Sequence, residues 1–195
     1  MGESAGDTEQ VNEAEYILEL AKRKQALRFG EFKLSAGGTS SYYFDGRLVT
    51  LDPEGAYRVA SAFYPLLLDC GAEAIAGPTL GADPIVAAVA AMSFTRGHPL
   101  PGLIVRMEAK RHGAGRTIEG PLERDAAVAV VDDTCSTGAS LVHAIEALEA
   151  EGCRVVKVMC ILDRHLGGSD EIRRRGYDFL ALLEADEEGV IKPIL

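Results

Sequence analysis

The stretch VVDDTCSTGAS, residues 130–140, decides how this chain folds, because it joins an apolar strand to a helix through two acids and a loop of small residues. The carboxylates Asp132 and Asp133 stand at the end of the apolar run. Small residues let backbone N–H groups approach an anion, and the start of the next helix carries a partial positive charge. A loop of this kind beside two acids suits a ligand with a phosphate at one end and hydroxyls or a metal ion at the other.

The same stretch has a simpler interpretation as a plain strand-to-helix turn in which Asp132 or Asp133 caps the helix. It is not a Walker A loop, since the lysine of the G-x-x-x-x-G-K-[ST] pattern is missing. Two consecutive acids at the end of a buried strand favour the ligand, because a buried charge is costly unless it is paired or binds something.

Outward from this stretch, apolar strands alternate with helical segments. We expect strands at 72–78, 101–106, 125–133, 153–163 and 177–184. We expect helices at 13–27, 53–71, 81–97, 138–152 and 169–176. Almost entirely apolar strands are typical of a mostly parallel sheet covered by helices on both faces, so the fold class is α/β. The polar segments after four of the strands then meet at one rim of the sheet, where ligands bind.

A length of 195 residues, with 47% hydrophobic and 26% charged residues, fits one folded domain. The net charge of -10 argues against nucleic acid or an anionic membrane as a partner. No apolar run approaches the roughly 20 residues of a membrane span, and residues 1–8 are expected to be a frayed tail, not a signal peptide. The cysteines form no C-x-x-C pair, which predicts reduced thiols and a cytoplasmic protein; they are Cys70, Cys135, Cys153 and Cys160.

The segment 130–140 resembles the phosphoribosyl-diphosphate (PRPP) motif of the type I phosphoribosyltransferases. The resemblance implies that Asp132 and Asp133 contact the ribose hydroxyls of PRPP and belong to the catalytic set. It also implies that the loop after them holds the 5′-phosphate; its residues are Thr134, Cys135, Ser136, Thr137, Gly138, Ala139 and Ser140.

Three further segments, 29–47, 106–120 and 162–168, are similar to parts of the orotate-using members of that family. The resemblance covers nearly the whole chain. It implies transfer of ribose 5-phosphate from PRPP to orotate, giving orotidine 5′-monophosphate and diphosphate, in pyrimidine biosynthesis. It further implies a small N-terminal base-binding hood at 29–50 and a mobile catalytic loop at 107–120.

Segment 106–119 is a basic run in an acidic protein, as a departing diphosphate requires. Taken alone, it is better interpreted as a solvated surface loop, which describes most charge runs. By resemblance, Arg106, Lys110 and His112 contact the diphosphate, with Lys110 and His112 catalytic, and Thr79 and Leu80 touch PRPP. The resemblance also implies Mg²⁺ held mainly by PRPP, with Asp132 and Asp133 in outer-sphere contact, and a homodimer that shares its catalytic loops between subunits.

Arg164 is expected to grip the orotate carboxylate, since the guanidinium fork suits bidentate capture. The alternative is a surface arginine paired with Asp163 or Asp170. The resemblance also assigns orotate contacts to four further residues, namely Ser35, Tyr43, Phe44 and Ser136. The alternative for Tyr43 and Phe44 is a place in the core, since aromatic residues in an alternating segment are more often buried there.

Three positions depart from the best-known family pattern, since Ser35, Leu80 and Met107 stand where lysines are expected. These changes indicate weaker PRPP binding, compensation from Lys33 or Arg111, or a variant subfamily. The segment TLGADP, residues 79–84, looks like a form that the family itself uses and favours the variant subfamily. Two other functions stay open: a purine phosphoribosyltransferase would share the PRPP loop but has no reason to keep Arg164, and a PRPP-sensing regulator could lose catalytic cations. Cys135 is interpreted as a small loop residue and not as a nucleophile.

Overall fold

A computed structural model of the protein describes residues 12–33, 39–108 and 117–194. The predicted tail at 1–8, the orotate contact of Ser35 and the roles of Lys110 and His112 therefore lie outside the described residues.

The centre of the molecule is a seven-stranded sheet with the strand order β5-β4-β3-β6-β7-β8-β9. The five inner strands are parallel, and the short edge strands β5 and β9 are antiparallel to their neighbours. The predicted α/β class and mostly parallel sheet are confirmed. The strands are β3 (Ala74–Pro78), β4 (Gly102–Val105), β5 (Ile118–Glu119), β6 (Ala127–Cys135), β7 (Arg154–Asp163), β8 (Phe179–Ala185) and β9 (Ile191–Pro193).

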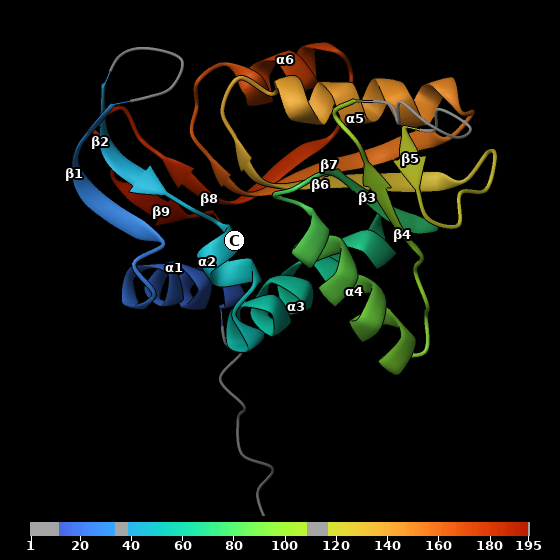
Figure 1. The fold of residues 1–195 in the computed structure, drawn as a ribbon, viewed down its shortest axis with the longest axis horizontal. Coiled ribbons are helices and arrows are strands. Elements are labelled where there is room, and N and C mark those ends of the chain that lie inside the picture. The colour runs from blue at the N-terminus through green and yellow to red at the C-terminus, as the bar shows by residue number, and fades with distance from the viewer. Residues whose placement is uncertain (1–11, 34–38, 109–116, 195) are drawn as a thin grey trace, which may run out of the picture.

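Helices cover both faces of this sheet, with α5 and α6 on one side and α1 to α4 on the other (Figure 1). Strand β6 serves both layers, because Val128 and Val130 pack with α5 while Ala129 and Val131 pack with the opposite helices. The helices are α1 (Glu13–Arg23), α2 (Arg47–Thr50), α3 (Pro53–Asp69), α4 (Asp83–Thr95), α5 (Ala139–Ala150) and α6 (Gly168–Arg174).

A separate antiparallel hairpin, β1 (Leu27–Lys33) and β2 (Thr39–Phe44), lies beside the β8–β9 end of the central sheet (Figure 1). The Ser41 hydroxyl donates to the Glu188 carbonyl and so joins the hairpin to the turn between β8 and β9. This position places the hairpin next to the carboxyl ends of the parallel strands.

One predicted helix boundary is wrong, and two elements are not among those predicted. The first helix ends at Arg23 instead of continuing to residue 27, and Gln25 has a φ of 56° that no α-helix permits. Residues 47–50 form helix α2, and β8 is followed by a further strand, β9. Asp52 caps α3, accepting hydrogen bonds from the backbone N–H groups of Glu54 and Gly55.

The order of the parallel strands places a topological switch point between β3 and β6. From β3 the chain continues to β4 on one side of this point, and from β6 it continues to β7 and β8 on the other side. Ligands of open parallel sheets bind in the crevice at such a point. Among the described helices, none combines the length and the apolar character that a bilayer crossing requires.

Candidate active site

The two acids stand at the end of β6, at the switch point. Asp132 is only 6% exposed, and its two carboxylate oxygens accept hydrogen bonds from the Ser140 hydroxyl at 2.9 Å and from the Asp133 backbone N–H at 2.9 Å. The Thr134 hydroxyl donates to Asp133 at 3.3 Å. The two carboxylates lie close together, because an oxygen of each is within 2.9 Å of the position that a Cβ on Gly81 would take.

The pair is electrostatically costly. Burial, followed by the neighbouring charge of Asp133, raises the pKa of Asp132, and hydrogen bonds from Ser140 and the Asp133 N–H only partly offset this. Burial is also the main cause that raises the pKa of Asp133, which the positive charge of Arg47 opposes. Strongly perturbed neighbouring carboxyls in a crevice are typical of functional sites.

Two glycines bring other segments against these carboxylates. A Cβ on Gly81 would lie 2.7 Å from Oδ1 of Asp133 and 2.9 Å from Oδ1 of Asp132. A Cβ on Gly46, at the start of α2, would lie 2.6 Å from the Cβ of Asp133. The segment after β3 and the segment after the hairpin therefore both close on the acid pair, and neither has room for a side chain.

The loop after the acids leads into α5, whose N-cap Gly138 has a φ of 78°. No side chain caps this helix, so the interpretation of Asp132 or Asp133 as a helix cap is wrong. The loop is held from the other side, since the Gly168 N–H donates to the Ser136 carbonyl at 2.9 Å. The first N–H groups of α5 are thus oriented toward the rim without a side-chain partner, as an anion site requires.

Cys135 is the last residue of β6, so its predicted placement in the loop is wrong. Its side chain is buried, and burial raises the pKa of the thiol to about 12. This environment does not suit a nucleophile, since the reactive thiolate is scarcely populated at neutral pH.

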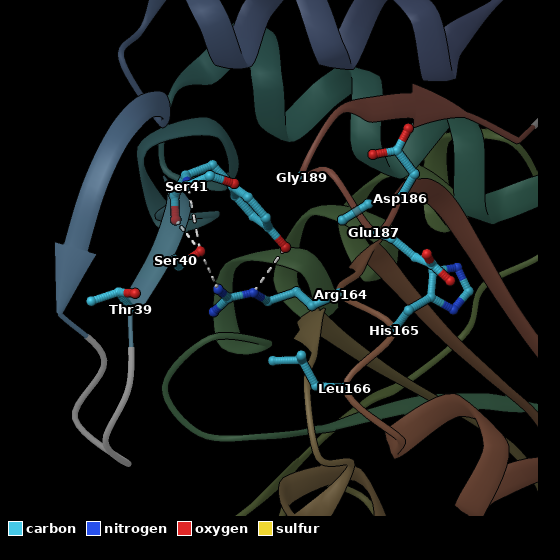
Figure 2. Close-up of a pocket in the computed structure, with 11 residues that line it drawn as sticks. Thr39, Ser40, Ser41, Arg164, His165, Leu166, Asp186, Glu187 and Gly189 are labelled. Carbon is cyan, nitrogen blue, oxygen red and sulfur yellow. Dashed lines mark hydrogen bonds between the residues drawn. The ribbon is translucent and has the colours of Figure 1, made fainter.

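Arg164 follows β7 and lies at the same rim, because its backbone N–H donates to the Cys135 carbonyl at 2.8 Å. The predicted alternative pairing with Asp163 or Asp170 is wrong: Asp163 accepts from the His165 N–H, and Asp170 lies 3.9 Å from Arg173. Within the described residues, Arg164 makes no ion pair. Its guanidinium turns instead toward the hairpin (Figure 2).

The Arg164 side chain donates from Nε to the Tyr42 hydroxyl at 3.1 Å and from Nη2 to the Ser40 hydroxyl at 3.4 Å. It borders a cavity of about 260 Å³ between the hairpin and the β8–β9 turn (Figure 2). The residues that line this cavity are Thr39, Ser40, Ser41, Tyr42, Arg164, His165, Leu166, Ala185, Asp186, Glu187 and Gly189.

The other predicted base contacts are placed less directly. Tyr43 is on the opposite side of β2 from Tyr42, and the guanidinium carbon of Arg28 lies 4.9 Å from the centre of its ring. Phe44 is buried in the core. Ser136 lies in the loop beside Gly168, so it shares the rim with Arg164. The roles of Tyr43, Phe44 and Ser136 stay predictions.

The predicted PRPP contacts outside the loop also lie near the rim. The Thr79 hydroxyl donates to Asp83 at 2.8 Å, its backbone N–H donates to the Val105 carbonyl at 2.9 Å, and the Thr79–Leu80 peptide bond is cis. Leu80 is 62% exposed. Arg106 directly follows β4; its side chain lies 3.8 Å from Glu119 and donates to the Glu108 carbonyl at 3.4 Å, both contacts between exposed groups.

Sequence reasoning missed several residues that shape the site: Ser40, Tyr42, Gly46, Arg47 and Gly81. Only Gly81 had a usable signal, because it lies in the segment after the buried strand β3, where a glycine often marks a close approach of another backbone or a ligand. The hydroxyls of Ser40 and Tyr42 became visible only once the hairpin was seen to dock beside Arg164.

Comparison with known proteins gives one consistent result. The family described as "Phosphoribosyl transferase domain" matches residues 74–179. The chain is 38% identical over 178 residues to the orotate phosphoribosyltransferase of Aquifex aeolicus, covering 90% of this chain and 97% of that protein. It is 43% identical over 158 residues to that of Nostoc sp., covering 80% and 76% of the two chains. The crystal structure of Mycobacterium tuberculosis orotate phosphoribosyltransferase in complex with PRPP superposes with a TM-score of 0.74 at 30% identity, covering 92% of this chain and 99% of that one.

Proposed function

Because this chain belongs to the orotate phosphoribosyltransferase family, we propose that it transfers the ribose 5-phosphate group of PRPP to orotate, giving orotidine 5′-monophosphate and diphosphate. The observation that carries this function is the convergence, at one rim, of three groups: an acid pair, an anion loop and an arginine without a carboxylate partner in the described part of the chain. Each matches one part of the reactants, namely the ribose, its phosphate and the orotate carboxylate.

For PRPP, Asp132 and Asp133 accept hydrogen bonds from the ribose hydroxyls, and the backbone N–H groups at the start of α5 bind the 5′-phosphate. The raised pKa of both acids in the free protein fits this role, because hydroxyl donors favour the ionised form and so compensate for burial. Positive charge develops on the ribose as the diphosphate leaves, and two carboxylates beside the sugar stabilise that charge.

For the diphosphate, we propose Arg106, Lys110 and His112 as the cationic contacts, with Lys110 as the main electrostatic contributor. Arg106 is available because its contact with Glu119 is long. Mg²⁺ fits as a metal brought by PRPP: the described residues hold no cluster of three potential ligands, while Asp132 and Asp133 offer oxygens of the kind that the hydrated ion accepts. When bound, the ion neutralises charge on the leaving diphosphate.

For the base, the Arg164 fork binds the orotate carboxylate, which uracil lacks. The purine alternative loses support, since a purine base offers this arginine no carboxylate. The experiment that tests the assignment is Arg164→Lys, which keeps the charge and removes the fork. We expect the KM for orotate to rise roughly tenfold or more while the KM for PRPP is unchanged. An unchanged orotate KM would remove Arg164 from the site.

We also propose a homodimer in which the segment 107–120 of one subunit completes the site of the other. Exposed apolar side chains on α3, on α4 and at the end of α2 supply a face that a second copy could cover, namely Leu51, Tyr57 and Phe94. Mixing an inactive Lys110→Ala variant with an inactive Asp133→Asn variant should restore part of the activity if sites are shared. If the two variants exchange subunits and the mixture still recovers no activity, the proposed sharing of sites is contradicted.

The proposed cytoplasmic location has one structural support, since all four cysteines are free thiols and three of them are buried.

A further inference from the structure

Two hydroxyls from the hairpin occupy one edge of the Arg164 guanidinium. Tyr42 takes the Nε hydrogen and Ser40 takes a hydrogen of Nη2, and these two nitrogens form one side of the planar fork. Figure 2 shows Ser40 on the hairpin side of Arg164. The end of the fork, formed by Nη1 and Nη2, keeps hydrogens for a ligand carboxylate.

The polarity of these hydrogen bonds is fixed by their neighbours. The Ser40 hydroxyl donates its own hydrogen to the Tyr42 carbonyl at 2.8 Å, so it can offer only a lone pair to Arg164. The Tyr42 hydroxyl likewise accepts from Nε, and its side chain is only 6% exposed. Both hydroxyls therefore accept from Arg164 and hold its guanidinium in place.

The backbone that carries Arg164 is fixed as well. Its N–H donates to the Cys135 carbonyl, and Asp163 accepts from the N–H of His165, which has a φ of 49°. With both ends of the side chain held, the rotamer freedom that an arginine normally loses on binding is largely lost before the ligand arrives.

We propose that Tyr42, supported by Ser40, is a positioning residue that sets the selectivity for the base by presenting only the Nη1–Nη2 end of Arg164 to the orotate carboxylate. Tyr42 acts through Arg164, and this inference rests on the proposed function. The competing role for the same contact is purely structural, a tie between the hairpin and the central sheet. The two roles predict different effects when the contact is lost. Loss of positioning weakens only the binding of ligands with a carboxylate, whereas loss of a structural tie affects orotate binding, PRPP binding and stability together.

The test is steady-state kinetics and binding on Tyr42→Phe, with Ser40→Ala as a second variant and Arg164→Ala in parallel. We expect Tyr42→Phe to raise the orotate KM roughly tenfold, with kcat and the PRPP KM changed less than about twofold. Tyr177→Phe is the matched control, because it also removes a single tyrosine hydroxyl bond, to Glu149 at 2.8 Å, far from the rim. On the Arg164→Ala background, Tyr42→Phe should add nothing further.

The outcomes separate the two claims. If Arg164→Ala leaves orotate binding intact, the proposed role of Arg164 falls. If Arg164→Ala impairs orotate binding but Tyr42→Phe does not, the positioning role is overturned. It is also overturned if Tyr42→Phe weakens orotate binding and PRPP binding equally and lowers the melting temperature.

Discussion

Replacing Asp132 by Asn should stabilise the free protein while it damages catalysis. The substitution removes one of two adjacent buried charges and keeps one oxygen, which can still accept from the Asp133 N–H. The new NH2 group then faces the Ser140 hydroxyl, which can turn to accept from it. A gain in stability on losing a functional side chain is expected where a site holds charges that only its ligand can compensate.

The gain depends on pH in a definite direction. The pKa of Asp132 in the folded state lies above the ordinary value of 3.8, so the folded protein binds the proton more tightly than the unfolded chain. The penalty is therefore absent below about pH 3.8 and grows as the pH rises toward the folded-state pKa. Each pKa unit of this rise costs about 1.4 kcal/mol. The rise from 3.8 to about 8 spans roughly four units, which sets an upper limit of about 6 kcal/mol for the penalty. A replacement amide that makes poorer hydrogen bonds returns about 1 kcal/mol, which leaves a net stabilisation of at most about 5 kcal/mol near pH 8.

Urea unfolding followed by circular dichroism, at about pH 5 and about pH 8, measures this difference directly. We expect the stabilisation by Asp132→Asn to be clearly larger at the higher pH, with activity reduced roughly a hundredfold or more. The control is Asp69→Asn, at the exposed end of α3, which should stay within about 0.5 kcal/mol of the original protein at both pH values. A variant less stable than the original protein near pH 8 would refute the claim that this carboxylate is uncompensated.

Two further predictions follow from contacts at the rim. Gly81→Ala would place a Cβ 2.7 Å from Asp133 and 2.9 Å from Asp132 and so displace the carboxylates. We expect steady-state kinetics on the folded variant to show kcat/KM for PRPP lowered roughly a hundredfold. A kcat/KM within about threefold of the original value would contradict the crowding. Burial raises the pKa of Cys135 to about 12, so native protein near pH 7 should resist alkylation at this thiol. The partly exposed Cys70 should react first. Peptide mass spectrometry that shows the reverse order would contradict the burial of Cys135.

The central sheet and the anion loop could be predicted from the sequence because their signals are local. Apolar strands such as β6 are buried on both faces, so their composition alone identifies them, and the periodic apolar positions of α5 follow at once. The acid pair could be placed at the rim because it ends a strand of a parallel sheet. These features depend on neighbours in the chain and little on distant contacts.

The hairpin side of the site could not be predicted, since it depends on register and docking. Tyr43 and Phe44 were named as base contacts, while Tyr42, one residue earlier, is the aromatic that reaches Arg164. Which of two alternating residues faces the site is set by pairing with β1, whose register shifts between Phe29 and Phe32. The short strand β9 carries only three residues and no periodic signal, so it too was missed.

The central claim is the reaction itself, and one measurement tests it most directly. Purified protein is mixed with orotate, PRPP and Mg²⁺, and the loss of orotate is followed by absorbance, with uracil, adenine and hypoxanthine in parallel. We predict that orotate alone is consumed and that its loss requires both PRPP and Mg²⁺. Consumption of another base in place of orotate would contradict the assignment of Arg164, and binding of PRPP with no base consumed would point to a PRPP-sensing regulator instead of an enzyme.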